Sequence, residues 1–257
     1  MSASDGADAA LVTGAGQGIG RAIATALASA GWAVAACDLG DRANATADAI
    51  SAAGGRAVAL AFDVSDAEAA ARAHESAVDA LGPVDVVVAN AGIVDQLAYA
   101  DRLSPEGWSR EVEINLSGAF YTIRPALPGM KQRSRGRIVV ISSVAALGGL
   151  KGQVAYAATK AGLLGLARTL ALELAPFGAT ANAVLPGFIA TERVAAMPAH
   201  IQERVLSHIP LRRFGAMEEV AALVSFLASP ASAYITGACI PIDGGLLLNQ
   251  LSLGRDA

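Results

Sequence analysis

The chain has 257 residues and a formal net charge of −4, and 54% of its residues are hydrophobic while only 5% are aromatic. This length suits one domain with a single substantial core, and a core of Ala, Val, Leu and Ile is typical of a parallel sheet covered on both faces. The negative charge argues against nucleic acid or an anionic membrane as a partner, and Cys37 and Cys239 stand in no C-x-x-C pattern that would indicate a metal site or a disulfide framework.

No segment is predicted to direct the chain to a membrane. The N-terminus, MSASDGADAA, has neither the basic nor the apolar stretch of a signal peptide, so a reducing, cytoplasmic location is expected. Residues 220–242 contain no charge and are long enough to span a bilayer on paper. Ser229-Pro230 and Thr236-Gly237 interrupt them, which favours a buried helix, a loop and a strand.

A glycine-rich loop, TGAGQGIG at residues 13–20, lies between an apolar run and a helical pattern. Glycines let the backbone approach a pyrophosphate where a Cβ would collide, and a helix N-terminus adds partial positive charge. Ile19 stands where the literal G-x-G-x-x-G pattern has its last glycine, and an ordinary glycine-rich turn is the alternative. The candidate cofactor-binding residues of this loop are Gly14, Gln17, Gly18, Ile19 and Gly20.

An acidic residue ends the second predicted strand. Residues 32–37 are apolar and lead to Asp38. A carboxylate at this distance from the glycine loop accepts hydrogen bonds from the adenosine ribose hydroxyls and repels a 2′-phosphate. Leu39 supplies no compensating charge, and Arg42 is expected in the next helix. Asp38 therefore predicts NAD as the cofactor in preference to NADP.

Polar residues also follow the next two predicted strands. A strand over residues 56–62 leads to Asp63-Val64, and one over residues 84–89 leads to Asn90-Ala91-Gly92. Asp63 also suits the N-cap of the following helix.

Ser104 is predicted to cap a long helix whose first residue is Pro105. Asn115 stands inside this helix. An asparagine in a helix interior is mildly unfavourable, because its side chain competes for backbone hydrogen bonds. We therefore treat Asn115 as a candidate site residue, with a plain polar helix position as the alternative.

The strongest chemical signal lies in residues 137–168. An apolar run ends at Ser142 and Ser143, a glycine-rich loop follows, and a helical pattern then presents Tyr156 and Lys160. Residues at i and i+4 share one helix face, so the ammonium group is expected beside the phenol. An unperturbed tyrosine has a pKa of ~10, and a nearby cation lowers it, which suits the phenol for proton transfer. Taken alone, the pair also fits a solvated helix face.

Together, these motifs resemble those of the short-chain dehydrogenase/reductase family along almost the whole chain. Ser143, Tyr156 and Lys160 have the spacing of its active-site signature, and the glycine loop, the N-A-G at residues 90–92 and the PGFIATE at residues 186–192 follow in family order. The resemblance implies that the tyrosine exchanges a proton with the substrate oxygen and that the serine hydroxyl fixes this oxygen. It also implies that the lysine binds the nicotinamide ribose and lowers the tyrosine pKa.

The resemblance assigns roles to the remaining candidates as well. It implies that the Asp63 carboxylate and the Val64 backbone contact the adenine, and that Asn115 holds a water linking Lys160 to solvent. It further implies that Asn90 steadies the sheet and that Gly92 leaves room for the cofactor. The backbone of Ile189 and the hydroxyl of Thr191 are implied to bind the nicotinamide carboxamide.

The expected fold is α/β: one doubly wound Rossmann-type domain over residues 1–257, with a seven-stranded parallel sheet. Residues 193–213 lose periodicity, and a lid over the substrate is expected near residues 190–213. The family pairs the helices that correspond to those carrying Asn115 and Tyr156, which implies a homo-oligomer, a dimer or a tetramer. The helix of Tyr156 is expected to end near Leu174.

The predicted function is NAD-dependent interconversion of a small-molecule secondary alcohol and a ketone, with no metal ion. One alternative is reduction of a 3-oxoacyl thioester on acyl carrier protein or coenzyme A, because residues 186–189 and 211–215 resemble those reductases. NADPH use in that group, and Phe177 in place of its usual basic residue, weigh against this alternative. An alternative outside enzyme function is a non-catalytic regulator that senses dinucleotides.

Overall fold

The structure is a computed structural model that describes residues 8–248; the predicted absence of a signal peptide concerns residues outside this range. Within it, seven strands form one sheet in the order β3-β2-β1-β4-β5-β6-β7, and every neighbouring pair is parallel. The predicted doubly wound α/β fold is thereby confirmed. The strands are β1 Ala9–Thr13, β2 Ala33–Asp38, β3 Ala57–Ala61, β4 Val84–Ala89, β5 Gly136–Ile141, β6 Ala179–Pro186 and β7 Cys239–Ile242.

The strands form because short apolar runs are buried on both sides by helices. All residues of β1, β4 and β6 are buried, as the doubly covered position of a parallel strand requires. Many of these residues are alanines or valines, whose small side chains let the helical layers approach the sheet closely.

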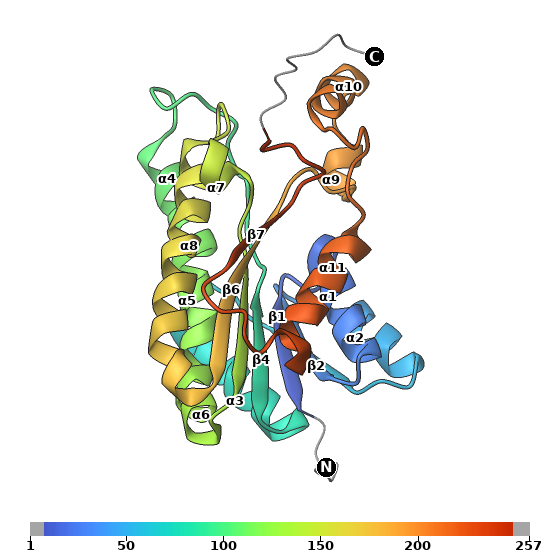
Figure 1. The fold of residues 1–257 in the computed structure, drawn as a ribbon, viewed down its shortest axis with the longest axis vertical. Coiled ribbons are helices and arrows are strands. Elements are labelled where there is room, and N and C mark those ends of the chain that lie inside the picture. The colour runs from blue at the N-terminus through green and yellow to red at the C-terminus, as the bar shows by residue number, and fades with distance from the viewer. Residues whose placement is uncertain (1–7, 249–257) are drawn as a thin grey trace.

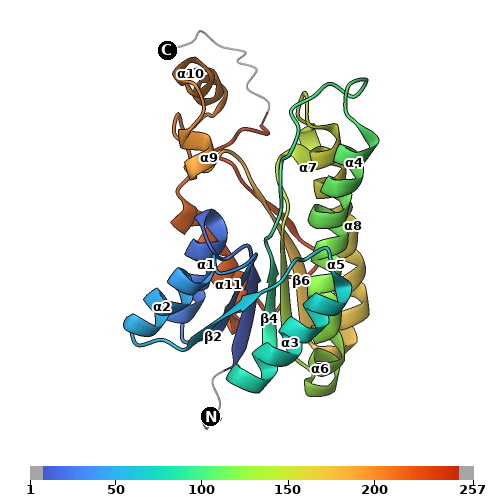
Figure 2. The same ribbon diagram turned by 180° about the vertical axis from the view of Figure 1, so that it is seen from behind.

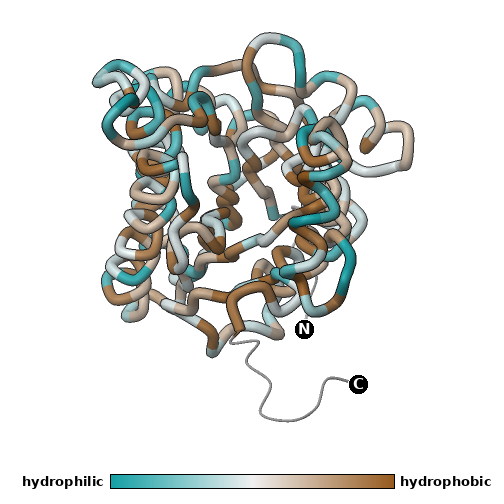
Figure 3. The backbone as a smooth tube through the Cα atoms, turned by 90° about the horizontal axis from the view of Figure 1, so that it is seen from above, coloured by the Kyte–Doolittle hydropathy of each residue, from teal (hydrophilic) through white to brown (hydrophobic). Residues whose placement is uncertain are grey.

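Helices cover the two faces of the sheet separately (Figures 1 and 2). One apolar core joins the sheet to the helices after β3, β4 and β5, and the second joins it to the helices after β1, β2 and β6. From above, the two helical layers stand on either side of the strands (Figure 3). The first layer contains α3 Ala67–Leu81, α4 Pro105–Val112, α5 Gly118–Ile123, α6 Leu127–Arg133 and α8 Val154–Leu174, and the second α1 Gly18–Ser29, α2 Asn44–Ala52 and α11 Met217–Ala228.

The strand order places the candidate residues at one edge of the sheet. From β1 the chain builds outward through β2 and β3, and it then returns to the other side of β1 with β4. At such a switch point the connections leave in opposite directions, and a crevice opens at the carboxyl ends of the strands. Thr13 ends β1 at this edge, and Asn90 and Ser142 follow β4 and β5 there.

The starts of α3 and α4 agree with capping rules. Ser104 Oγ accepts a hydrogen bond from Gly107 N at 3.1 Å, and Pro105 begins α4, as predicted. The cap of α3 is Asp66, which accepts from Glu68 N and Ala69 N. Asp63 is not this cap, because its Oδ1 accepts from Ser65 N and Ser65 Oγ instead.

Two segments in the second half of the chain, residues 220–242 and 193–213, can be compared with the sequence predictions. The uncharged segment is divided into α11, a 3₁₀ turn at Pro230–Ser232 and β7, as predicted, and no helix within residues 8–248 is long and apolar enough to cross a membrane. The expectation of an irregular stretch over residues 193–213 is wrong in part. Two helices lie there, α9 Glu192–Ala195 and α10 Ala199–His208, and α10 buries none of its residues, which explains the missing apolar period.

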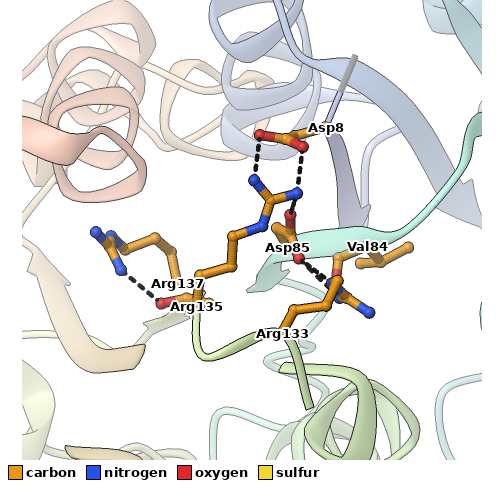
Figure 4. A network of polar contacts seen from close by, with 7 residues as sticks. Asp8, Val84, Asp85, Arg133, Arg135 and Arg137 are labelled. Atoms are coloured by element: carbon orange, nitrogen blue, oxygen red, sulfur yellow. Dashed lines mark hydrogen bonds and ion pairs between the residues drawn. The ribbon is translucent and has the colours of Figure 1, made fainter. Parts of the chain in front are cut away.

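A charged network lies at the amino ends of the strands, far from the switch point (Figure 4). Asp85, in β4, is buried. Its Oδ1 accepts hydrogen bonds from two nitrogens of Arg133, Nε at 2.9 Å and Nη2 at 2.7 Å. Arg135 lies 2.6 Å from Asp85 Oδ2 and also binds Asp8. The network ties β1, β4 and the end of α6 together.

Candidate active site

The glycine loop after β1 is folded too tightly for side chains. Gly14 and Gly18 have φ of 66° and 53°, which glycine adopts without strain. A Cβ on Gly20 would lie 2.0 Å from Gly14 O, so α1 can begin only against a bare backbone. The loop thus presents backbone groups and a helix start at the switch point, where a dinucleotide pyrophosphate would sit.

Asn90 joins the glycine loop to the end of β4. Its Nδ2 donates to Thr13 O at 2.8 Å, and its backbone N donates to Thr13 Oγ1 at 3.1 Å. A Cβ on Gly14 would lie 2.8 Å from Asn90 Nδ2. The predicted role of Asn90 in steadying the sheet corresponds to these contacts.

Asp38 lies at the carboxyl end of β2 and faces the loop. Its Oδ2 accepts from Gly16 N at 2.8 Å, and its Oδ1 accepts from Leu39 N at 2.8 Å. A carboxylate has about four lone-pair positions, so each oxygen keeps room for one more donor, such as a ribose hydroxyl.

Sequence reasoning overlooked Gly16. A Cβ at this position would lie 2.8 Å from Asp38 Oδ2 and 2.8 Å from Arg42 Cβ, so only glycine admits both neighbours. The second glycine of TGAGQGIG was the signal for it. The placement of Arg42 was also wrong, because α2 begins at Asn44 and Arg42 lies in the preceding turn, beside the loop.

Asn115 lies in a π-helical turn, Glu113–Ser117, between α4 and α5. Its Oδ1 accepts from Ile93 N at 2.7 Å and its Nδ2 donates to Ile93 O at 2.8 Å. The side chain therefore holds the chain just after Gly92, which is more than a plain polar helix position would do. Such wide turns often mark functional sites.

Lys160 is buried and turns toward the sheet. Its Nζ donates to Ile141 O at 2.7 Å, and Ser142 Oγ donates to Lys160 O at 2.7 Å. A Cβ on Gly92 would lie 3.1 Å from Asn115 Oδ1 and 3.3 Å from Lys160 Nζ. The residues after β4, the π turn and α8 thus meet at one point.

The electrostatics of the phenol differ from the sequence expectation. Burial raises the pKa of Tyr156, while hydrogen bonding to Ser143 and the positive charge of Arg193 act in the opposite direction. The ammonium of Lys160 lies 5.7 Å from the ring centroid and points at a carbonyl oxygen, so the expected lowering of the tyrosine pKa does not prevail. Burial also lowers the pKa of Lys160 to about 8, which leaves it mostly protonated at neutral pH.

Ser143 is placed to donate its hydroxyl hydrogen. It is almost fully buried at the end of β5, and its Oγ accepts a hydrogen bond from Ala145 N at 3.1 Å. This contact occupies a lone pair and leaves the hydrogen for a partner on the Tyr156 side.

The loop after β6 reaches the glycine loop. Thr191 N donates to Ile189 O at 2.7 Å, and a Cβ on Gly18 would lie 3.8 Å from Thr191 Cγ2. Val64 packs against Gly118, where a Cβ would lie 2.8 Å from Val64 Cγ2. The contacts predicted for these residues with adenine and carboxamide remain predictions.

A pocket of about 510 Å³ lies on another face of α8. It is lined there by Val154, Ala157 and Ala158, and across from them by Tyr99 and Leu150. At 100° per residue, Val154 and Ala158 point away from the face that carries Tyr156 and Lys160. None of the four candidate catalytic residues lines this pocket.

A parallel sheet with this strand order and a glycine loop at its switch point defines a dinucleotide-binding α/β protein. The bare-backbone loop, Asp38 and the space kept by Gly92 fit a nicotinamide dinucleotide. Among residues 8–248, no three His, Cys, Asp or Glu side chains gather as metal ligands would.

Comparisons with known proteins give the family. A family model described as enoyl-(acyl carrier protein) reductase matches residues 14–247. The chain is 42% identical over 235 residues to an acetoacetyl-CoA reductase of Synechocystis sp., covering 91% of this chain and 94% of that protein. It is 41% identical over 242 residues to a 3-oxoacyl-[acyl-carrier-protein] reductase of Staphylococcus aureus, covering 93% and 98%.

A solved structure agrees with these relatives. The 3-oxoacyl-[acyl-carrier protein] reductase of Brucella melitensis superimposes with a TM-score of 0.90 at 38% identity, over 96% of this chain and 93% of that one. The chain belongs to the short-chain dehydrogenase/reductase family, as its motifs predicted, and it is an oxidoreductase of that family.

Proposed function

We propose that the protein interconverts a small secondary alcohol and a ketone with NAD(H), using Tyr156 as the general acid and base. The observation that carries this proposal is the meeting of Asn115, Lys160 and Gly92 at the carboxyl ends of β4 and β5, with Ser143 hydrogen-bonded to the phenol. When bound, the nicotinamide supplies or accepts the hydride.

The side chains account for the proton and the orientation of the substrate. In ketone reduction, Tyr156 Oη donates its proton to the substrate oxygen, and Ser143 donates a hydrogen bond to the same oxygen. The raised pKa of Tyr156 favours this direction, because it keeps the phenol protonated at neutral pH. Lys160 donates to Ile141 O with one of its three hydrogens, and the other two are available to a ribose hydroxyl.

The experiment that tests the proposal is a screen of simple ketones and secondary alcohols with NADH and NAD. Turnover that depends on Tyr156 supports it. Binding of NADH with no turnover across a broad panel would instead favour a dinucleotide-sensing regulator.

The cofactor preference rests on Asp38, and Asp38→Asn should change it. The variant loses a charged acceptor for the ribose hydroxyls, so kcat/KM with NADH should fall about 10- to 100-fold. Activity with NADPH should rise, because the repulsion of a 2′-phosphate is removed while Arg42 remains beside the loop. Steady-state kinetics with both cofactors measure the change.

Arg42 provides the matched control. Adding Arg42→Ala to Asp38→Asn should abolish the gain with NADPH and leave the NADH value of the single variant almost unchanged. A wild-type enzyme that prefers NADPH would refute the NAD proposal.

The second candidate function is reduction of a 3-oxoacyl thioester, favoured by the names of the relatives above. Phe177 stands where those reductases usually have a basic residue, and the Lys131 ammonium lies 5.5 Å from the centre of its ring. The Lys131 ammonium is thus a cation close to this position, and it makes a cation–π contact with the Phe177 ring. Assays of acetoacetyl-CoA, an acetoacetyl carrier protein and a simple ketone at equal concentration separate the candidates.

A homo-oligomer remains part of the proposal. The outer side of the first helical layer exposes Trp108, Phe120, Val154 and Leu172, the last with 79% of its surface accessible. Exposed large apolar residues on neighbouring helices support pairing of this face with a second subunit. Sedimentation of the purified chain distinguishes a monomer from a dimer or tetramer.

A further inference from the structure

Glu111 is a buried carboxylate that the mechanism above does not use. It lies in α4 and only 2% of its surface is accessible. Its Oε1 accepts from Asp95 N at 2.9 Å, whereas its Oε2 is buried without a hydrogen-bond partner among residues 8–248. An unpaired buried acceptor is costly to the fold, so its presence calls for an explanation.

The position of Glu111 relates it to the catalytic helix. It stands in α4, four residues before Asn115 of the π turn, and both side chains hold the segment after Gly92. Asn115 Nδ2 lies 3.4 Å from Thr159 Oγ1, and Thr159 Oγ1 donates to Tyr156 O at 2.8 Å. Asn115 is therefore level with the turn of α8 that follows Tyr156.

The two helices run in the same direction, since each begins after the carboxyl end of a strand (Figures 1 and 2). Glu111, four residues before Asn115, is therefore level with the turn of α8 that precedes Thr159, and this turn contains Tyr156. The charge of Glu111 acts on the phenol in the direction that opposes loss of its proton.

We propose that Glu111 is a positioning residue for Tyr156: it holds the segment after Gly92 through Asp95 and places a buried carboxylate beside the turn of α8 that carries the phenol. This inference rests on the proposed function for its meaning, since a protonated phenol is the form that reduces ketones. It predicts that Glu111 contributes, together with burial of the phenol, to the pH range over which the enzyme acts as a reductase.

Other charges near these two groups are few. Arg193 and Lys160 are the cations on the Tyr156 side, and Arg193 opposes the effect of Glu111. Asp95 is the neighbouring acid on the Glu111 side, and it forms an ion pair with Arg110 at 3.2 Å. Because the Asp95 and Arg110 side chains are 42% and 63% accessible, solvent and their mutual pairing weaken their influence on the phenol.

The test is Glu111→Gln, which keeps an acceptor for Asp95 N and removes the charge. The alkaline limit of ketone reduction should move to lower pH by about half a pH unit or more, because the phenol loses its proton more readily. Alcohol oxidation, which needs the deprotonated form, should begin at lower pH by the same amount. An unchanged pH profile in a folded variant, or a shift to higher pH, would overturn the inference.

Two controls keep the outcome interpretable. Asp95→Asn removes the nearby exposed charge and should leave the profile in place. Glu111→Asp keeps a charge at the position and should retain most of the wild-type profile; if Glu111→Gln does not fold, a wild-type-like profile for Glu111→Asp supports the inference and one shifted to higher pH contradicts it.

A direct titration separates this inference from the proposed function. Phenolate absorbance of Tyr156, obtained by subtracting the titration of Tyr156→Phe in each background, requires no substrate. Ionisation at lower pH in Glu111→Gln than in the wild type supports the inference even if no ketone is ever reduced. Coincident titrations would refute it even if ketone reduction were established.

Discussion

Replacing Tyr156 with phenylalanine is expected to lower kcat about 10²- to 10⁴-fold, the contribution that a positioned acid or base usually makes. The change removes only the hydroxyl group that exchanges a proton with the substrate oxygen. NADH affinity should remain close to the wild-type value, because the glycine loop, Asp38 and Lys160 are untouched. Steady-state kinetics and a fluorescence titration of NADH measure the two quantities.

Tyr121 supplies the matched control for this substitution. It lies in α5 and packs against the core of the first helical layer, away from the catalytic groups. Tyr121→Phe should therefore leave kcat within about twofold of the wild type. Removing a hydroxyl group at such a position changes the stability of the fold and not the catalytic step. Unimpaired turnover by Tyr156→Phe would defeat the proposed mechanism.

Asp85→Asn is expected to destabilise the fold by about 2–3 kcal/mol. Removing one partner from a fully buried ion pair costs about 3–5 kcal/mol, but Arg133 and Arg135 are partly accessible and can turn to water. For a chain of this size the melting temperature should fall by about 4–12 °C. Differential scanning calorimetry of the two proteins at equal concentration gives the difference.

The location of the network decides what this variant should leave unchanged. Asp85 stands at the amino end of β4, whereas the catalytic groups follow the carboxyl ends of the strands. At a temperature where both proteins are folded, kcat should be equal. Asp8→Asn is the milder comparison, because Asp8 is more exposed and, within residues 8–248, pairs only with Arg135. It should cost less than about 1 kcal/mol.

Much of the fold followed from local patterns in the chain. Apolar runs of four to eight residues between helical periods match the seven strands, and α8 ends at Leu174 as expected. The glycine loop, Asn90 and Asp38 were found because each follows a strand, where parallel topology brings side chains to one edge. α9 and α10 escaped prediction because an exposed helix carries no apolar period.

The site was less predictable where it depends on contacts between distant segments. The direction of Lys160 Nζ depends on the carbonyl of Ile141 in β5, and spacing along α8 contains no information about it. Glu111 resembles its solvent-facing neighbours Glu106 and Glu113 in sequence, and only its spacing of four from Asn115 was a signal. In the π turn, Asn115 binds the backbone of Ile93, and helical propensity does not encode such a contact between distant segments.

The wide turn at Glu113–Ser117 also restricts how the length of this chain can change. Such a turn holds one more residue than an α-helical turn, so the helix beyond it is rotated by roughly 100° from a continuous α-helix. Glu111 before the turn meets Asp95, and Gly118 after it meets Val64. Deleting a single residue from the turn would allow either the Glu111–Asp95 contact or the Gly118–Val64 contact, but not both. Insertions and deletions should therefore accumulate in the connection before Ser104, and a chimaera between relatives should be joined there.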